Sequence, residues 1–170
     1  YYDEYGYELK RIDEYNSNYV SGLIAPDGAL YGVPSIDEGL HTLAYPKMYI
    51  RQDWLDQLDL EMPTTTEEFR DMLRAFTSND LNGDGKNEIG LTGATASCLP
   101  QWSLIGQSFI NLRRNLWLYV DEVTQEIQFA PAQDAYREGL RYVKSLYDEG
   151  LIDPAAFTQT ADQMAVTIRT

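Results

Sequence analysis

The nine residues from Asp80 to Glu88, Asp-Leu-Asn-Gly-Asp-Gly-Lys-Asn-Glu, constrain the fold more than any other stretch of the sequence. Oxygen-bearing side chains occupy alternate positions, and two glycines provide the backbone freedom that a tight loop requires. Alternation around a sharp turn brings side-chain oxygens toward one centre, which is the arrangement that a hard cation needs. The spacing therefore predicts a structural calcium loop with the ligands Asp80, Asn82, Asp84, the carbonyl oxygen of Lys86, and Glu88.

A solvated turn without metal is the alternative, because Asn, Gly and Asp form such turns on their own. Calcium fits the loop better than magnesium, which demands a near-octahedral shell and keeps its waters. A helix-loop-helix calcium sensor would carry an acid three residues after Glu88, where this chain has Leu91. Residues 89–93 are typical of a short strand and turn rather than of an exiting helix. We therefore expect a calcium clip and not a switch that opens a groove.

Composition limits the classes of partner. The chain has 170 residues, of which 44% are hydrophobic and 24% are charged, so one globular domain with a core is the default expectation. The formal net charge of -14 disfavours nucleic acid and anionic membrane surfaces as partners. No apolar run approaches the roughly 18 residues that a membrane span requires.

Apolar periodicity and turn residues outline the elements in the first half of the chain. Apolar and aromatic residues spaced by three and four predict an amphipathic helix over residues 2–19. Pro26 and Gly28 predict a turn at residues 25–29. We expect a short strand at residues 30–34, an extended stretch at residues 44–51 and a short helix at residues 53–58.

The second half carries stronger signals. Thr65 and Glu68 form a capping-box pattern, which predicts a helix that runs to about Phe76. Two short apolar stretches, residues 117–120 and 126–130, flank an acidic turn and predict a hairpin. Residues 134–149 predict a further helix that Gly150 ends. The apolar faces that we expect on these two helices are Phe69, Met72, Leu73 and Phe76 on the first, and Tyr136, Leu140, Val143, Leu146 and Tyr147 on the second.

The order of these motifs resembles a known family. Residues 25–35 (Ala-Pro-Asp-Gly-Ala-Leu-Tyr-Gly-Val-Pro-Ser), residues 49–69, the calcium loop, and residues 135–154 followed by Phe-Thr-Gln at 157–159 are similar to extracellular solute-binding lipoproteins of ABC importers. The resemblance covers most of residues 25–160 and is strongest to members that handle carbohydrates. It implies an α/β fold, namely a portion of a two-lobed periplasmic-binding-protein-like fold that is helix-rich with short strands.

The resemblance also implies a function. Such a receptor is not an enzyme; it captures an extracellular solute, here a sugar, and delivers it to ABC permease subunits. Its location would be the cell surface, with the membrane contacted only through a lipid anchor that this chain does not include. Because family members are much longer, we expect residues 1–170 to be a single internal fragment. Within it, residues 25–51 would cross between the lobes, and residues 52–160 would form a helical section of one lobe with the calcium loop.

Some family members place calcium in a loop of this kind, away from the sugar, where the ion ties a helix to a strand. The present loop departs from the commonest pattern because Ile89 stands where a second acid would follow Glu88.

Sugar sites use aromatic faces and planar polar side chains, which makes four aromatic residues the first candidates. Trp54 and Trp117 lie in apolar patterns that favour burial in a core. Gln107 and His41 could add hydrogen bonds, although an isolated histidine is more typical of an ordinary loop. The residues that we expect at the ligand site are therefore Trp102, Tyr45 and Gln101.

Two other classes of function stay open. A secreted glycan-cleaving hydrolase with a structural calcium site would need two carboxyl groups about 5–10 Å apart beside a cleft. The acid pairs at residues 67–68, 121–122 and 148–149 are explained by helix ends and a turn. The sequence has no serine elbow, histidine-metal motif or phosphate-binding glycine loop, so we assign no catalytic residue. The other alternative is a cell-surface interaction module, since a fold does not dictate a function.

Overall fold

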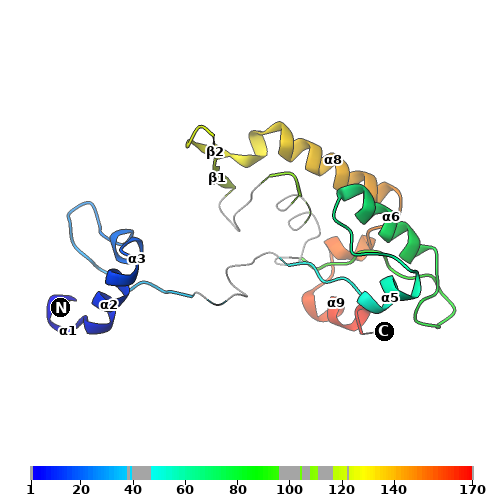
Figure 1. The fold of residues 1–170 in the computed structure, drawn as a ribbon, viewed down its shortest axis with the longest axis horizontal. Helices are drawn as coiled ribbons and strands as arrows, with labels where there is room; N and C mark the ends of the chain where they lie inside the picture. The colour runs from blue at the N-terminus through cyan, green and yellow to red at the C-terminus, as the bar shows by residue number, and fades with distance from the viewer. Residues whose placement is uncertain are drawn as a thin grey trace. The chain divides into compact units, whose positions relative to one another are not determined.

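The computed structural model describes residues 2–37, 39, 47–95, 104, 108–110, 117–121 and 123–169. The chain divides into two compact units, Tyr1–Tyr45 and Pro46–Thr170, and each unit is considered by itself (Figure 1). In the described ranges, none of the helices is both long enough and apolar enough to cross a membrane.

The described part of the first unit contains three short helices: α1 (Tyr2–Tyr5), α2 (Tyr7–Tyr15) and α3 (Asn18–Ser21). The sequence predicted one continuous helix over residues 2–19, and the structure interrupts it twice. Gly6 separates α1 from α2, and Asn16 ends α2 because its backbone is extended, with φ -152° and ψ 98°. Tyr5 and Tyr15 are 69% and 75% exposed, so the expected continuous apolar face does not form.

The turn at residues 25–29 is confirmed. The amide of Gly28 donates to the carbonyl of Ala25 at 2.8 Å, and Gly28 has the positive φ of +83° that favours glycine. The strand that we expected at residues 30–34 is limited to one antiparallel bridge between Ile24 and Leu30.

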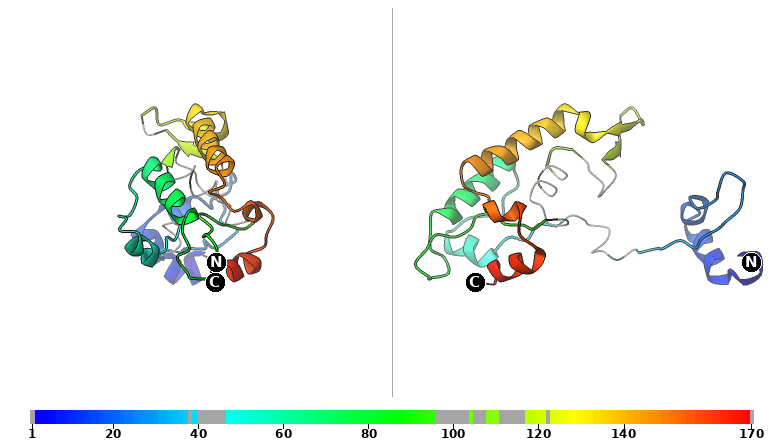
Figure 2. Two further views of the ribbon diagram at one scale, coloured as in Figure 1. Left: turned by 90° about the vertical axis from the view of Figure 1, so that its right-hand side faces the viewer. Right: turned by 180° about the vertical axis from the view of Figure 1, so that it is seen from behind.

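The second unit contains the longer helices (Figures 1 and 2). Its described residues include a two-stranded antiparallel hairpin, as the sequence predicted. The register is Leu118↔Phe129, Tyr119↔Gln128 and Val120↔Ile127. The elements are α5 (Gln52–Gln57), α6 (Thr66–Thr77), β1 (Leu118–Val120), β2 (Ile127–Phe129), the 3-10 helix η1 (Ala130–Ala132), α8 (Asp134–Asp148), the 3-10 helix η2 (Pro154–Phe157) and α9 (Ala161–Thr167).

Helix α6 begins where the sequence predicted. The hydroxyl of Thr65 accepts the amide of Glu68 at 3.2 Å, and the carboxylate of Glu68 accepts the amide of Thr65 at 3.1 Å. This capping box satisfies amides that the first turn would otherwise leave without partners. At the other end of the unit, Gly150 stops α8 with a φ of +73°.

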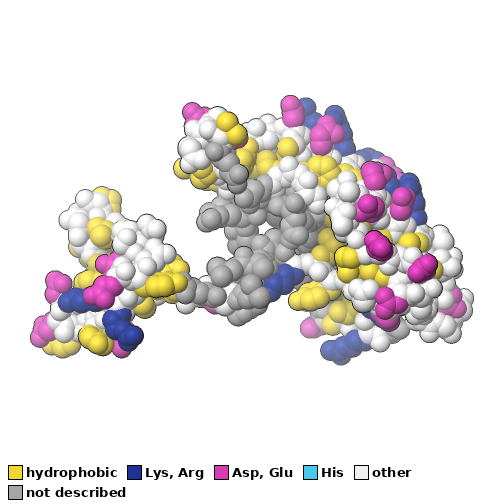
Figure 3. Space-filling model, in the orientation of Figure 1, with side chains coloured by type: hydrophobic (Ala, Val, Ile, Leu, Met, Phe, Trp, Pro, Cys, Tyr) yellow, Lys and Arg dark blue, Asp and Glu magenta, His cyan; other side chains and the backbone are white. Residues whose placement is uncertain are grey.

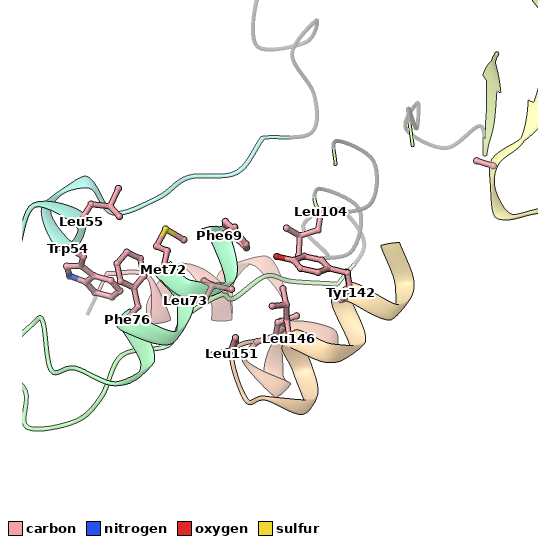
Figure 4. Packing of buried hydrophobic residues seen from close by; sticks show 14 residues of the cluster. Trp54, Leu55, Phe69, Met72, Leu73, Phe76, Leu104, Tyr142, Leu146 and Leu151 are labelled. Carbon is pink, nitrogen blue, oxygen red and sulfur yellow. The ribbon is translucent and has the colours of Figure 1, made fainter. Parts of the chain in front are cut away.

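The core lies between α5, α6, α8 and the segment that follows α8 (Figure 4). All four residues of the expected apolar stripe on α6 are buried. Leu73 of α6 and Leu146 of α8 are among the largest side chains with almost no exposed surface. The buried face of α8 differs from the expectation, because Leu140 is 45% exposed and Tyr147 is 44% exposed. Its buried residues are Gly139, Tyr142, Val143 and Leu146.

Polar contacts connect α6 and α8 beside this core. The hydroxyl of Tyr142 donates to the carbonyl of Thr66 at 2.6 Å, and burial raises the pKa of Tyr142 to about 12, so the hydroxyl keeps its proton. Arg70 and Arg74 both pair with Glu149. These contacts advance along both helices in the same direction, so α6 and α8 run parallel.

The solvent-facing sides of α6 and α8 carry many charges of both signs (Figure 3). Several of these charges pair with residues three or four positions away on the same helix, the spacing that brings helical side chains together. The pairs include Arg74 with Asp71, Arg141 with Glu138, and Lys144 with Asp148.

Replacement of Leu146 by alanine is expected to lower the free energy of unfolding by about 2–5 kcal/mol, because it leaves a cavity between α6 and α8. Leu140 lies on the same helix but is 45% exposed, so Leu140→Ala is the matched control and is expected to change stability little. Urea unfolding followed by circular dichroism measures both variants. Equal losses for the two variants would contradict this packing.

The Glu149 carboxylate should make stability depend on acidity. Hydrogen bonds from Arg74 and then Arg70 lower the pKa of Glu149 from its ordinary 4.5. The stabilisation is therefore complete above that ordinary pKa and is lost as the pH falls through the lowered pKa of the folded chain. Unfolding measured from about pH 6 to pH 3 should show a shallower acid loss for Glu149→Gln than for the unmodified chain. Asp162→Asn, on the exposed first turn of α9, controls for removal of one carboxylate.

Candidate functional site

The candidate metal loop, residues 80–88, follows directly from the end of α6. Two hydrogen bonds close its neck: the amide of Glu88 donates to the carbonyl of Asn79 at 3.1 Å, and the side-chain amide of Asn87 donates to the carbonyl of Thr77 at 3.1 Å. The second bond also satisfies a carbonyl at the carboxyl end of α6, which lacks a partner within the helix. Both ends of the loop are therefore fixed to α6.

Asp80 organises the first half of the loop. One of its carboxylate oxygens accepts the amides of Gly83 and Asp84, at 2.8 and 3.1 Å, and the other accepts the amide of Gly85 at 2.9 Å. Gly83 and Gly85 have positive φ values of +79° and +86°, which glycine adopts without strain. The two glycines thus allow the chain to wrap around the Asp80 carboxylate.

Glu88 closes the second half. Its Oε1 accepts the amides of Leu81 and Asn82, at 2.9 and 2.8 Å, so the carboxylate lies over the start of the loop. The side-chain oxygen of Asn82 accepts the amide of Asp84 at 2.8 Å. The carboxylate of Asp84 accepts the amide of Lys86 at 2.9 Å in the same way. All four side chains named as ligands therefore fold back on the loop.

The donor set consists of oxygens alone, which suits calcium or magnesium and not a softer metal. In the part of the chain that the structure describes, however, no three His, Cys, Asp or Glu side chains converge closely enough to hold an ion. Asp80 and Glu88 already face the loop, whereas the contacts of Asp84 are with the backbone two residues on. The residue types and the closed path fit a calcium site, and the carboxylates would have to move closer together to complete it.

The segment after the loop is attached to the end of α8. Leu91 forms a parallel bridge with Ile152, through bonds from the Leu91 amide to the Leu151 carbonyl at 3.0 Å and from the Asp153 amide to the Leu91 carbonyl at 2.8 Å. Gly90 allows this close approach, since a Cβ at this position would lie 2.8 Å from the Leu151 oxygen. The loop thus connects the end of α6 to the turn after α8.

The buried side chain of Gln159, which was not predicted from the sequence, adds further hydrogen bonds to the segment after the loop. Gln159 is 8% exposed, and its side-chain amide donates to the Thr92 hydroxyl at 2.9 Å and to the Gly93 carbonyl at 2.6 Å. The backbone carbonyl of Gln159 accepts hydrogen bonds from both the amide and the hydroxyl of Thr95. The signal for such a residue was weak, because an isolated glutamine is usually exposed.

Arg51 adds a positive charge near the loop. The hydrogen bond to Asp53 raises the pKa of Arg51, and attraction to the carboxylate of Glu88 acts in the same direction. The Arg51 guanidinium also lies over the ring of Trp54, 4.6 Å from its centroid. The positive charge of Arg51, immediately before α5, is therefore attracted to the negative charge of the loop.

The residues that we expected at the ligand site, Trp102, Tyr45 and Gln101, lie outside the described residues, as do His41 and Gln107. Trp54 is in the core, as its apolar pattern predicted, with its ring 5.3 Å from that of Phe76. Trp117 is half-buried, packs edge-on against Tyr136, and has a left-handed backbone with φ 50°.

Comparison with known proteins identifies relatives. No protein-family model matches the chain. The fructooligosaccharide ABC transporter substrate-binding protein FusA of Streptococcus pneumoniae is 31% identical over 162 residues, which are 91% of this chain and 30% of FusA. The polygalacturonan/rhamnogalacturonan-binding protein YtcQ of Bacillus subtilis is 29% identical over 129 residues, which are 75% of this chain and 24% of YtcQ.

Solved structures agree. FusA from S. pneumoniae in complex with kestose matches 95% of this chain with a TM-score of 0.68 and 29% identity. An EF-hand mutant of FusA in complex with fructo-nystose matches the same share with a TM-score of 0.70. The chain covers 34% of each of these structures. It therefore has a portion of the α/β fold that we expected. The chain is therefore a relative of the substrate-binding proteins of ABC transporters and corresponds to part of one.

Proposed function

We propose that the protein that contains this chain captures an extracellular carbohydrate and delivers it to ABC permease subunits. The similarity to FusA, which extends over 91% of this chain, is the observation that carries the proposal. FusA is a fructooligosaccharide substrate-binding protein and has been solved in complex with kestose, so an oligosaccharide is the ligand class that we assign here. We assign the cell surface as the location and a lipid anchor as the contact with the membrane.

A binding role without catalysis is part of this proposal. The relatives are substrate-binding proteins, which supports binding over turnover. We assign residues 25–51 to the crossing between two lobes and residues 52–160 to one lobe. The boundary between the two compact units, at Tyr45–Pro46, falls inside the first of these ranges and supports the division.

We assign the ligand site to Trp102, Tyr45 and Gln101, because an aromatic face and planar polar groups suit a sugar. Of the four aromatic candidates, Trp54 is buried in the core and Trp117 is half-buried, which leaves Trp102 and Tyr45 as the aromatic residues of the proposed site.

Titration of the longer parent protein with a panel of oligosaccharides, including kestose, is expected to give saturable heat without product. Trp102→Ala should weaken binding by about 2 kcal/mol or more, as for a central aromatic at an interface. Tyr49→Ala removes an aromatic that is 88% exposed in this chain and is the control. Release of smaller sugars would indicate the hydrolase, and no heat with any sugar would indicate the interaction module.

We also propose a structural calcium site formed by Asp80, Asn82, Asp84, the Lys86 carbonyl and Glu88. The closed neck and the inward-facing Asp80 and Glu88 carboxylates support it. The solved EF-hand mutant of FusA, a relative of this chain, also supports it. When bound, the ion would neutralise the carboxylates and hold the end of α6 against the Leu91 segment.

Calcium is expected to raise the melting temperature of the chain, and a chelator should lower it, because a ligand that binds only the native state stabilises that state. At a hundredfold excess over Kd the gain is about 2.7 kcal/mol. Asp84→Asn should remove most of the shift. Glu61→Gln changes an exposed acid outside the loop and should retain the shift. Melting curves that respond to neither calcium nor chelator would exclude the site.

A further inference from the structure

The loop contains the sole Asn-Gly pair of the sequence, Asn82-Gly83. Both residues are exposed, and glycine offers no side chain that would hinder approach to its nitrogen. A Cβ placed at Gly83 would meet nothing within 4 Å, so no neighbouring group crowds this side of the Gly83 Cα. These are the conditions under which the backbone nitrogen after an asparagine can attack the asparagine side chain.

Two hydrogen bonds favour this attack. The amide of Gly83 donates to a carboxylate oxygen of Asp80 at 2.8 Å, so an acceptor for the proton of the attacking nitrogen is in place. The Asn82 side-chain oxygen accepts the amide of Asp84 at 2.8 Å, which stabilises the negative charge that develops on this oxygen during attack.

We propose that Asn82 is a site of spontaneous deamidation, promoted by the folded loop in its metal-free form. A bond forms between the Gly83 nitrogen and the Asn82 side-chain carbon, and the bond from that carbon to its amide nitrogen breaks. The proton leaves the Gly83 nitrogen for the Asp80 carboxylate and reaches the departing nitrogen through water, so ammonia is released and a cyclic imide remains. Water then opens the imide to aspartate or to isoaspartate.

The modification changes the donor set of the loop. Aspartate at position 82 adds a negative charge next to those of Asp80 and Asp84. Isoaspartate instead inserts a methylene into the backbone between residues 82 and 83, so it changes the spacing between the second and third ligands and moves the carboxylate onto the Cα of residue 82. This consequence, and the protection described next, rest on the proposed calcium site.

A cation in the loop should slow the reaction. It would draw the Asp80 carboxylate away from the Gly83 proton and hold the Asn82 oxygen in a fixed position. Asn82 would therefore deamidate while the loop is without metal and remain intact while metal is bound.

The test is incubation of the whole chain with chelator or with calcium, followed by digestion with trypsin and mass spectrometry. Cleavage after Arg74 and Lys86 isolates residues 75–86, which contain Asn79 and Asn82 but not Asn87. Fragmentation locates the mass increase from amide to carboxylate, and an isoaspartate methyltransferase assay detects the rearranged product. With chelator we expect Asn82 to react at least about tenfold faster than Asn79 or Asn87, a barrier difference of about 1.4 kcal/mol.

Two comparisons separate the folded loop from the dipeptide itself. The rate at Asn82 in the native chain with chelator should equal or exceed that in urea-unfolded chain; a native chain that stays intact while the unfolded chain reacts would overturn the proposal. Gly83→Ala should slow the reaction at least about tenfold. Gly85→Ala is its matched control, since it introduces the same strain at a φ of +86° in equally open space and leaves the Asn82-Gly83 bond unchanged.

Calcium separates the two proposals. If deamidation proceeds at the same rate with calcium and with chelator, and the melting temperature responds to neither, the calcium assignment is wrong and the modification stands. If Asn82 reacts no faster than Asn79 and Asn87 with chelator while calcium still raises the melting temperature, the metal site stands and this inference is wrong.

Discussion

The packing of α6 against α8 is the interaction on which the rest of the second unit depends. Leu73 and Leu146 are fully buried at this contact, and the hydrogen bond from Tyr142 to Thr66 together with the pairs of Arg70 and Arg74 with Glu149 fixes how the helices lie along each other. Apolar burial supplies most of the stabilisation, and the directional polar contacts select one alignment of the two helices. The ends of these helices then define where the metal loop can attach.

The loop is held by more than its own residues. Its neck is bonded to the last turn of α6, and the segment after it is bonded to the turn after α8. Gln159 extends this chain of contacts to Thr92 and Thr95. The segment from the end of the loop to residue 95 is therefore held in place by backbone hydrogen bonds and by a buried side-chain amide.

Local signals in the sequence predicted the second unit well. The capping box at Thr65, the stripe of α6, the hairpin and the stop at Gly150 depend on neighbouring residues and are confirmed. The buried face of α8 was only partly correct, because burial depends on which side of the helix meets α6 and that is set by distant residues. The prediction of a single helix over residues 2–19 was wrong. Its apolar periodicity continues across Gly6 and Asn16, where the structure interrupts the helix. Spacing alone predicted the calcium loop, which stays a prediction. The contacts of Gln159 involve partners 66 residues away in the sequence, and the expected sugar-binding residues fall outside the described ranges.

Gly90 restricts which residue can follow the loop. A Cβ at this position would lie 2.8 Å from the Leu151 oxygen and 2.9 Å from the Thr77 side chain, and the Leu151 contact is with backbone, which cannot give way as a flexible side chain can. Any larger residue would therefore push this segment away from the end of α8 and open the bridge between Leu91 and Ile152.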